Sequence, residues 1–402
     1  MNVLFIVTEL NSANGICTQS VMREFLANGH SVYCITNNEP HDTLYPDIKY
    51  SFVKPRLVYR LLKSKKRSVR IVGTILNKLK LLISYPTWPL ISPSYTTRIY
   101  EKAEKMCRDE KIDIVIPIYT QIDTLIAAKK IKKKHPKIKY VPYFLDSLSG
   151  GYGPKYLSKA WLNRRGSKWE KRLLGTADKI IMMRSSFEHY FSHRESAPFF
   201  NKTVFLDLPL ITKPLPATSS SKSDGLTHLV YVGTIPAHIR DPEIFLKVFC
   251  KIENQNYRLH IFGTSTCSEL LERYARKDPR IVIEGPVSHD KALQQVTEAD
   301  VLVNLGNNIS SMTPSKIFEY MSYGKPILST MPIKNEPSIP YLKKYPLAHL
   351  IDYSDTDIDA LARETQSWID RTTNSTIPFS LVEEIFSDNT PKRFLETVIP
   401  KV

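Results

Sequence analysis

The chain has 402 residues, of which 42% are hydrophobic, so it is long enough for two globular domains with separate cores. No apolar run approaches the roughly 18 residues of a membrane-spanning helix, which argues against an integral membrane protein. The net charge of +16 is uneven: residues 1–212 hold 35 lysines and arginines against 17 acids, and residues 213–402 hold 21 against 23. This asymmetry predicts an anionic partner of the N-terminal half, whether membrane, nucleic acid or phosphorylated substrate.

The cysteines and the N-terminus both favour a cytoplasmic protein. The five cysteines are odd in number and form no C-x-x-C pair, which is typical of reduced thiols. The first residues, MNVLFIVTELNS, lack the basic start and the small-residue cleavage site of a secretory signal, and they predict a first strand instead.

Strand-like apolar runs alternate with helical periodicity along the whole chain. In the N-terminal half, a helix is expected from Gly15 to Asn28, between the first two of the strands at 2–10, 31–36, 113–119, 138–145, 178–183 and 203–208. Residues 211–226 are rich in Pro, Ser, Thr and Lys and predict a linker. The pattern then restarts, with strands expected at 228–233, 258–263, 280–285, 300–305 and 326–330, and a helix from about Pro242. Such alternation predicts two parallel α/β halves, each resembling a nucleotide-binding unit.

The stretch TPSKIFEYMSYGKPILST, residues 313–330, holds the clearest functional signal. Lys316 and Glu319 lie three residues apart, hence on one face of a predicted helix and close to its start. An ammonium ion and free backbone N–H groups can bind phosphate together at such a place. A solvent-exposed Lys–Glu pair without a ligand is the structural alternative. Gly324 and Pro326 fit a helix stop and need no ligand.

This stretch, together with YVGTIPAHIRDPE (231–243) and LANGHSVYCIT (26–36), resembles glycosyltransferases of the GT-B fold, most closely the large retaining family 4. The resemblance implies an α/β fold with two Rossmann-like, doubly wound domains facing across a cleft. A nucleoside diphosphate sugar would bind at the carboxyl ends of the second domain's strands. The implied organisation is an acceptor-binding domain at 1–210, a linker at 211–226, a donor domain at 227–385 and a C-terminal helix at 386–402.

The resemblance also implies roles for residues of the second half. Glu319 matches a glutamate that accepts hydrogen bonds from the ribose hydroxyls. Arg240 and Lys316 match cations that stabilise the departing diphosphate, although Arg240 can also be a solvated surface residue. Further donor contacts are expected from Gly233, Thr234, Thr313, Pro314 and Ser315.

The sequence departs from the family at one position. Many members carry a second glutamate near the donor sugar, but the matching residue here is Ser311. Its absence leaves the sugar and strict membership of family 4 open. Neutral side chains of Asn307, Asn308, Ser310 and Ser311 are candidates to bind sugar hydroxyls instead.

Two features of the N-terminal half are candidates for substrate contact. Asn14 and Gly15 open the first helix, where a glycine lets backbone approach a ligand, although Asn-Gly is also a common turn. Asp146 follows a strand and precedes the loop SLSGGYG, where a carboxylate can orient an acceptor hydroxyl or simply cap the next turn.

A basic amphipathic segment at about 54–90 predicts contact with an anionic membrane. Within SVRIVGTILNKLKLLI, apolar residues recur at helical spacing, with basic residues largely off that stripe. Trp88, between two prolines, would add an aromatic side chain suited to a bilayer interface. The alternative is a helix packed on its own sheet, with its basic residues in solvent. The basic residues expected at the membrane or acceptor are Lys63, Lys65, Lys66, Arg67, Arg70, Lys78 and Lys80. A second cluster, KKIKKKHPKIK at 129–139, has poor apolar spacing and fits a solvated helix end equally well.

Neither a metal nor a nucleic acid is expected. The acids of DTDID, residues 355–359, precede a helical run and fit helix caps. The basic residues come with no aromatic recognition motif and no zinc spacing.

The resemblance implies a retaining hexosyltransferase, expected to be metal-independent, with no cofactor besides its nucleotide-sugar co-substrate, which is expected to be UDP-linked. The acceptor would be lipid-linked or a saccharide, in bacterial capsule, O-antigen or exopolysaccharide biosynthesis. The enzyme would be cytoplasmic and peripheral on the inner face of the cell membrane. Inversion, with Asp146 as a base, stays open. The alternatives are a GT-B nucleotide-sugar epimerase and a non-catalytic polyanion-binding protein.

Overall fold

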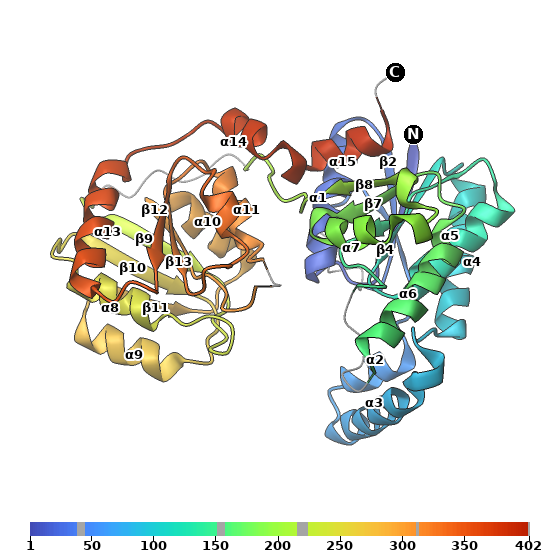
Figure 1. Cartoon of the computed structure of the whole chain (residues 1–402), viewed down its shortest axis with the longest axis horizontal. Coiled ribbons are helices and arrows are strands. Elements are labelled where there is room, and N and C mark those ends of the chain that lie inside the picture. Colours follow the sequence, from blue (N-terminus) through green and yellow to red (C-terminus); the bar gives the residue numbers. More distant parts are fainter. Residues whose placement is uncertain (38–44, 151–156, 215–223, 311–312, 401–402) are drawn as a thin grey trace. The chain divides into compact units, whose positions relative to one another are not determined.

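The chain divides into two compact units in a computed structural model that describes residues 1–37, 45–150, 157–214, 224–310 and 313–400 (Figure 1). Unit 1 comprises Met1–Pro209 and Asp388–Val402, and unit 2 comprises Leu210–Ser387. Each unit has its own parallel sheet and its own hydrophobic core, so the predicted α/β class with two doubly wound halves is confirmed.

Unit 1 is built on an eight-stranded sheet in the order β3-β2-β1-β4-β6-β7-β8, with β5 pairing to β4. Leu4 belongs to a core that includes residues of α4 and α5, whereas the next residue, Phe5, packs edge-on against Phe25 of α1 at 5.5 Å. Helices on both faces explain why these strands are almost continuously apolar. The strands are β1 (Asn2–Ile6), β2 (Ser31–Thr36), β3 (Lys49–Phe52), β4 (Ile114–Tyr119), β5 (Lys139–Tyr140), β6 (Tyr143–Phe144), β7 (Ile180–Met183) and β8 (Thr203–Leu206).

The last helix of the chain, α15, belongs to unit 1 and not to the unit that precedes it in sequence. Thr390 caps it by accepting from the Arg393 amide at 3.1 Å, and Phe394 packs edge-on against Tyr143 of β6 at 4.8 Å. A helix is thus found within residues 386–402, where the sequence predicts one. The helices of unit 1 are α1 (Ala13–Ala27), α2 (Leu57–Leu62), α3 (Arg67–Thr87), α4 (Pro93–Asp109), α5 (Ile122–Lys134), α6 (Lys159–Leu174), α7 (Phe187–Ser192) and α15 (Pro391–Val398).

Unit 2 has a six-stranded sheet in the order β11-β10-β9-β12-β13-β14. The strands are β9 (Thr227–Val232), β10 (Tyr257–Phe262), β11 (Ile281–Gly285), β12 (Val301–Asn304), β13 (Ile327–Met331) and β14 (Ala348–Asp352). The strand order reverses between β9 and β12, and ligands of doubly wound sheets bind outside the carboxyl ends of the strands at such a point.

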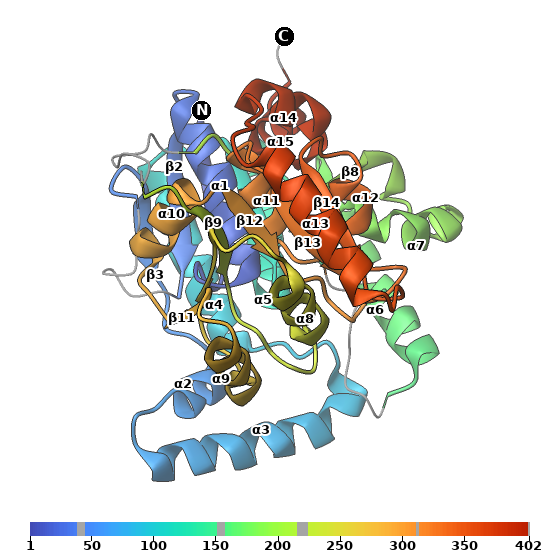
Figure 2. The same cartoon turned by 90° about the vertical axis from the view of Figure 1, so that its left-hand side faces the viewer.

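Helices cover both faces of this second sheet. The core beneath β9 and β10 includes residues of α8, α9 and α13, and α8 and α13 lie beside one another in Figure 2. The helices of unit 2 are α8 (Glu243–Lys251), α9 (Ser268–Lys277), α10 (His289–Glu298), α11 (Lys316–Ser322), α12 (Ile339–Leu342), α13 (Ile358–Thr372) and α14 (Phe379–Ile385).

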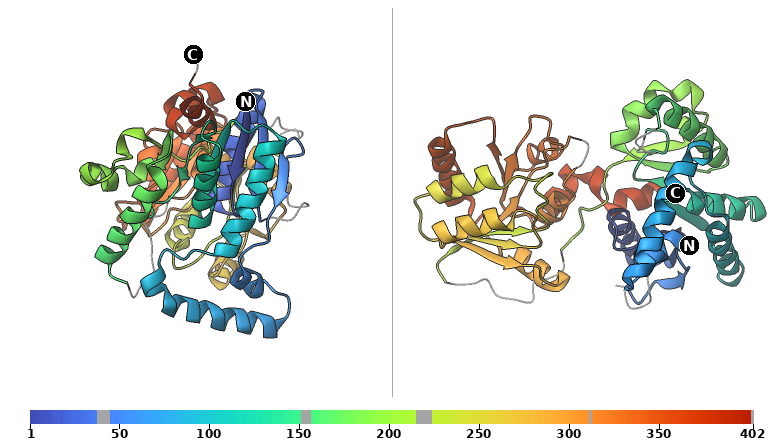
Figure 3. Two further views of the ribbon diagram at one scale, coloured as in Figure 1. Left: turned by 90° about the vertical axis from the view of Figure 1, so that its right-hand side faces the viewer. Right: turned by 90° about the horizontal axis from the view of Figure 1, so that it is seen from below.

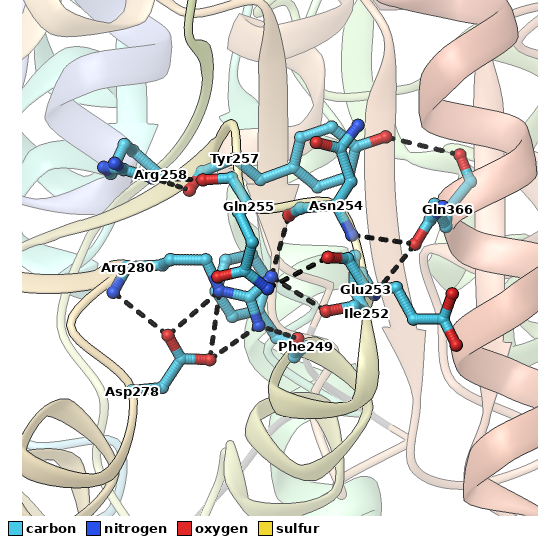
Figure 4. A network of polar contacts seen from close by, with 10 residues as sticks. All are labelled: Phe249, Ile252, Glu253, Asn254, Gln255, Tyr257, Arg258, Asp278, Arg280 and Gln366. Atoms are coloured by element: carbon cyan, nitrogen blue, oxygen red, sulfur yellow. Dashed lines mark hydrogen bonds and ion pairs between the residues drawn. The ribbon is translucent and has the colours of Figure 1, made fainter.

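A buried arginine fastens the end of α8 to the start of β11 (Figure 4). The side chain of Arg280, a residue only 5% exposed, donates to the carbonyl oxygens of Phe249, Ile252 and Asn254 at 2.8–3.2 Å. Its remaining donors bind the Asp278 carboxylate, the shortest contact being 2.7 Å. Burial by itself would raise the pKa of Asp278, but the bonds from Arg280 hold it below its ordinary value. This network holds the turn between α8 and β10 in place. The turn lies at the amino ends of the strands, on the opposite edge of the sheet from the switch point.

Candidate functional site

Helix α11 is tied to the end of β9 by a buried tyrosine. The hydroxyl of Tyr320, a residue 1% exposed, accepts from the Val232 amide at 3.0 Å and lies 3.3 Å from the Val232 carbonyl. Burial raises the pKa of Tyr320, which therefore stays a neutral phenol. The contact ties α11, which carries Lys316 and Glu319, to the end of β9, just before the loop that begins at Gly233.

Arg240 lies in that loop, between β9 and α8, and its guanidinium is held by neutral acceptors. Nε donates to Asn307 Oδ1 at 2.9 Å, and an Nη donates to the Thr234 carbonyl at 2.8 Å and to the Tyr231 hydroxyl at 3.2 Å. Tyr231 itself donates to Thr234 at 3.0 Å. Arg240 is thus half-buried and oriented by protein contacts, which differs from the solvated alternative. These acceptors, from the described part of the chain, carry no formal charge, so they leave its positive charge available for an anion.

Lys316 and Glu319 form an ion pair on the first turn of α11. Lys316 Nζ lies 3.0 Å and 2.9 Å from the two oxygens of the Glu319 carboxylate, and the side chains are 31% and 33% exposed. The predicted common face is therefore confirmed. This geometry is also that of the structural alternative, an i,i+3 pair, so the roles in ribose and phosphate binding stay predictions.

The residues around this pair occupy different positions. Pro314 is buried and Thr313 half-buried, whereas Ser315 is exposed and its side chain makes no capping bond to the helix. Thr234 is also exposed, and Gly233 donates its amide to the Phe262 carbonyl at 2.9 Å.

Gly324, near the end of the stretch 313–330, stops helix α11, as the sequence predicts. Its φ is +67°, and a Cβ there would collide with the Ile377 carbonyl, so only glycine fits this helix stop. The neighbouring Lys325 donates to the carbonyls of Thr297 and Ala299 at the end of α10. Burial lowers the pKa of Lys325. Its ammonium is committed to that helix end.

Two residues behind Arg240 were not expected from the sequence to act there: Asn307, in the loop after β12, and Glu336, in the segment after β13. Asn307 was a candidate for sugar binding, but it is 0% exposed and its side chain binds Arg240. Glu336, from the segment after β13, accepts from the Asn307 amide at 3.3 Å. The position of Asn307 just after a strand could have indicated a site residue from sequence alone. No feature of the sequence around Glu336 indicates such a role. Of the other sugar-binding candidates, Asn308 and Ser310 are exposed, and Ser311 lies outside the described residues.

The start of α1 gives Gly15 a structural purpose. Its amide donates to the Ser12 hydroxyl at 3.1 Å, and a Cβ at this position would collide with the carbonyl oxygens of Glu9 and Leu10. The glycine is buried and packs closely on these carbonyls, which gives it a structural role, and the donor contact expected of Gly15 stays a prediction. Asn14 is half-buried, and its carbonyl accepts from Thr18 at 2.7 Å.

Asp146 follows β6 and is exposed, on a loop that is firmly held. Desolvation by the surrounding protein nevertheless raises the pKa of its carboxyl. Behind it, the buried Glu170 accepts from the Ser149 amide at 2.8 Å and from the Tyr190 hydroxyl at 2.6 Å. A carboxylate that stands at a strand's carboxyl end on a rigid base can orient a substrate hydroxyl.

Residues 57–87 form a helical hairpin of α2 and α3, which projects from the sheet of unit 1 (Figures 2 and 3). A Cβ on Gly73 would lie 2.9 Å from the Leu61 Cβ and 2.9 Å from the Leu62 nitrogen, so this side of α3 packs on α2. The apolar stripe points elsewhere and is 37–73% exposed. It consists of Ile71, Val72, Ile75, Leu76, Leu79 and Leu82. The amphipathic helix is confirmed, and the alternative of a stripe packed on the sheet is wrong.

The base of this hairpin is fixed by one buried carboxylate. Asp123 on α5 accepts from Arg56, where the chain enters α2, and from the Ser92 amide at 2.9 Å, where it leaves for α4. The basic residues along the hairpin are exposed: Lys63, Lys65, Lys66, Arg67, Arg70 and Lys78. The side chain of Lys80 lies outside the described residues.

Trp88 does not face a membrane. It is 8% exposed, belongs to the core of unit 1 and lies 6.2 Å, ring to ring, from Trp161. Arg165 also donates to its carbonyl at 2.8 Å. The interfacial role predicted for Trp88 is therefore wrong: the aromatic ring fills the core where the hairpin rejoins the unit.

Other charged groups singled out by the sequence serve the fold. Asp357 caps α13 by accepting from the Ala360 amide at 2.9 Å, as expected of these acids. In the second basic cluster, Lys132 binds Asp178 at 3.0 Å and Lys134 binds Glu104 at 2.8 Å. All five cysteines are free.

Neither a metal cluster nor a membrane span is found among the parts of the chain that the structure describes. No three acids, histidines or cysteines gather there in a way that could hold a metal ion. No helix there is long and apolar enough to cross a bilayer.

Residues 227–352 match the model of the family described as Glycosyl transferases group 1. Among curated proteins, no sequence matches the chain. The chain is similar to the structure of the lipopolysaccharide outer core galactosyltransferase WaaB in its apo form, with 15% identity, a TM-score of 0.52 and full coverage of both chains. It is also similar to Anabaena Alr3699/HepE in complex with UDP-glucose, with 12% identity, a TM-score of 0.58 and 99% coverage of both.

A third similar structure is a UDP-N-acetylglucosamine 2-epimerase, with 11% identity, a TM-score of 0.53, and coverage of 98% of this chain and 95% of the other. Identities this low establish the fold and not the activity. The chain therefore has the GT-B fold. Residues 227–352 of its second unit match the Glycosyl transferases group 1 model, so the resemblance to GT-B glycosyltransferases is confirmed, whereas membership of family 4 stays a prediction.

Proposed function

We propose that the protein transfers a sugar from a nucleoside diphosphate donor, expected to be UDP-linked, to a lipid-linked or saccharide acceptor. The observation that carries this proposal is the arrangement at the carboxyl ends of β9 and β12. There the contacts of the half-buried Arg240 within the described residues are all to neutral acceptors, and Lys316 and Glu319 lie on a helix tied to the same strand end. The group 1 match covers all of these residues.

The chemistry needs charge stabilisation more than it needs an enzyme nucleophile. As the glycosidic bond breaks, negative charge gathers on the diphosphate, and Arg240 and Lys316 are the cations that would offset it. Glu319 would bind the ribose hydroxyls. We propose retention of the anomeric configuration, with Asp146 orienting the acceptor hydroxyl. The likeness to a protein solved with UDP-glucose supports a UDP donor.

The α2–α3 hairpin is the element that would hold the protein on an anionic membrane. The apolar stripe of α3 faces solvent, and its most exposed residue, Leu82, is 73% exposed. Exposed basic residues lie along the same hairpin. Contiguous apolar surface of this kind marks an interaction site, and each basic residue near an anionic surface contributes about 1 kcal/mol. A membrane-bound acceptor suits surface-polysaccharide assembly, in line with the likeness to a lipopolysaccharide galactosyltransferase. We therefore place the protein at the inner face of the cell membrane.

A vesicle assay tests the membrane contact. Glutamine in place of Lys63, Lys65, Lys66, Arg67 and Arg70 should abolish cosedimentation with phosphatidylglycerol vesicles. The matched control replaces five exposed lysines elsewhere on unit 1, Lys102, Lys105, Lys133, Lys137 and Lys168, and should sediment like the wild type. A second variant, with serine at Ile75, Leu79 and Leu82, should also fail to bind. Undiminished sedimentation of both hairpin variants would exclude the hairpin as the membrane contact.

Calorimetric titration with UDP, GDP and ADP in the presence of EDTA tests the donor site. Selective binding of one nucleotide would support the proposal and name the base. Absence of binding to all three would favour a polyanion-binding protein.

The epimerase alternative has its own readout, because the chain shares its fold with such an enzyme. An epimerase would convert UDP-N-acetylglucosamine to its 2-epimer without any acceptor, and the sugar product can be followed by NMR. A transferase leaves the donor sugar's C2 configuration unchanged.

A further inference from the structure

Glu336 is a buried carboxylate that the proposed function does not use. The residue is 1% exposed and lies between β13 and α12. One oxygen accepts from the Asn307 amide at 3.3 Å, and the other accepts from the Ser338 amide at 2.8 Å and from the Ser338 hydroxyl. Burial raises the pKa of Glu336, although these hydrogen bonds oppose the shift. Burying a carboxylate costs folding free energy, so a carboxylate in such a position is expected to have a structural or functional role.

Asn307 joins Glu336 to Arg240. Its main-chain amide donates to Glu336, and its side-chain oxygen accepts from Arg240 Nε at 2.9 Å. The residue before it, Gly306, donates to the Thr330 hydroxyl at 2.8 Å, and a Cβ on Gly306 would collide with the Thr330 carbonyl. The segment just after β12, at Gly306 and Asn307, therefore packs directly on the end of β13.

The acceptors recorded for Arg240 are an amide oxygen, a main-chain carbonyl and a phenol. A carboxylate in direct contact would hold the guanidinium as well, but it would also neutralise the charge that a diphosphate needs. Glu336 stands one residue behind this contact, and the neutral Asn307 transmits its constraint. The arrangement orients the Arg240 guanidinium without placing a negative charge in contact with it.

We propose that Glu336 is a positioning residue, which acts through Asn307 to hold the Arg240 guanidinium in the orientation that a diphosphate meets. This proposal rests on the proposed function, because it assigns Arg240 to the donor diphosphate. It adds two residues to that site with distinct roles, since Asn307 orients the cation and Glu336 fixes Asn307.

Glutamine at position 336 is a sharp perturbation. Both oxygens of Glu336 accept from donors, but a glutamine side chain has a single oxygen and turns an NH₂ group toward the other donor. When its oxygen faces Ser338, which offers two donors, the NH₂ group repels the Asn307 amide. Glu336→Gln therefore displaces Asn307 without opening a cavity. Asn307→Ala provides a second variant, which keeps the main-chain amide that contacts Glu336 and removes the side-chain oxygen that accepts from Arg240.

Binding of UDP, GDP and ADP, each beside its own nucleoside, tests the proposal by calorimetry. Both variants should weaken binding of the nucleoside diphosphate about tenfold, while the nucleoside binds as in the wild type. In an Arg240→Ala background, Glu336→Gln should cause no further loss, because the two residues act as one unit. Glu104→Gln, at a 6% exposed glutamate of unit 1, is the matched control and should leave binding unchanged.

Two results would overturn the positioning role. The first is an equal loss of nucleoside and nucleoside diphosphate affinity, and the second is the same loss with and without Arg240. Either would leave Glu336 as a residue that merely stabilises the unit.

The Arg240 Nε–H group gives a readout that needs no nucleotide. In protein labelled with ¹⁵N-arginine, its signal is assigned by its disappearance in Arg240→Lys. Its exchange with solvent should be faster in Glu336→Gln and in Asn307→Ala at unchanged melting temperature. An unaltered exchange rate in Glu336→Gln would contradict the positioning role. If the wild type bound no nucleotide at all, the donor assignment would fail, whereas the exchange experiment would still decide the contact.

Discussion

Replacing Glu319 by alanine should weaken nucleotide binding through the ribose and not through the phosphates. The lost interaction is a charged hydrogen bond, worth about 1–3 kcal/mol, which corresponds to roughly a 5- to 150-fold rise in Kd. The Glu319 side chain is 33% exposed, so water competes for the carboxylate and the lower half of this range is expected. The variant also frees Lys316 from its partner, and the freed ammonium offsets at most about 1 kcal/mol by binding the diphosphate better.

The comparison of UDP with 2′-deoxy-UDP isolates the ribose contact. The wild type should prefer UDP, because Glu319 can accept from the 2′-hydroxyl, and Glu319→Ala should bind both nucleotides almost equally. Glu269 offers a matched control, since it is an exposed glutamate on the first turn of another helix of unit 2, α9. Glu269→Ala should keep the preference. If Glu319→Ala kept it as well, the assignment of Glu319 to the ribose would be refuted, and the Lys316–Glu319 pair would be a surface ion pair only.

Two further predictions concern stability. Arg280→Leu should lower the free energy of unfolding by about 3–5 kcal/mol in chemical denaturation, because Asp278 stays buried without its partner; a loss below about 1 kcal/mol would contradict the network in Figure 4. Burial raises the pKa of Glu170 in the folded protein. Above about pH 4.3 the unfolded chain has lost this proton while the folded protein still holds it. The free energy of unfolding therefore falls as the pH rises from about 4.3 to the folded-state pKa. Glu170→Gln should flatten this fall in melting temperature across that window, whereas an unchanged slope would mean that Glu170 does not titrate there.

Local pattern was sufficient for several contacts in the second half of the chain. Lys316 and Glu319 are three residues apart, and Asp357, Thr390 and Gly324 act within one turn of their own helices. Such contacts depend on the geometry of a single element, which the spacing of residue types specifies. The alternation of apolar runs with helical periods likewise determined the parallel class, because parallel strands need a crossover helix between them.

Local pattern missed one edge strand of each sheet. The strands β3 and β14 were not expected, and residues 138–145 form two short strands, β5 and β6, where one was predicted. Edge strands carry fewer buried residues, as the partly exposed β3 and β14 illustrate, so their apolar signal is weak.

Contacts between distant parts of the chain were decided only by the tertiary structure. Trp88 reads as an interfacial aromatic in sequence but fills a core with Trp161, and the apolar stripe of α3 is left uncovered because α2 takes a different side of the helix. Glu336 reaches Asn307 across 29 residues, and Arg240 reaches it across 67. These approaches follow from the order of strands in the sheet of unit 2, which brings β9, β12 and β13 together. Sequence spacing specifies which residues share one helix face, but the strand order decides which separate elements meet at the site.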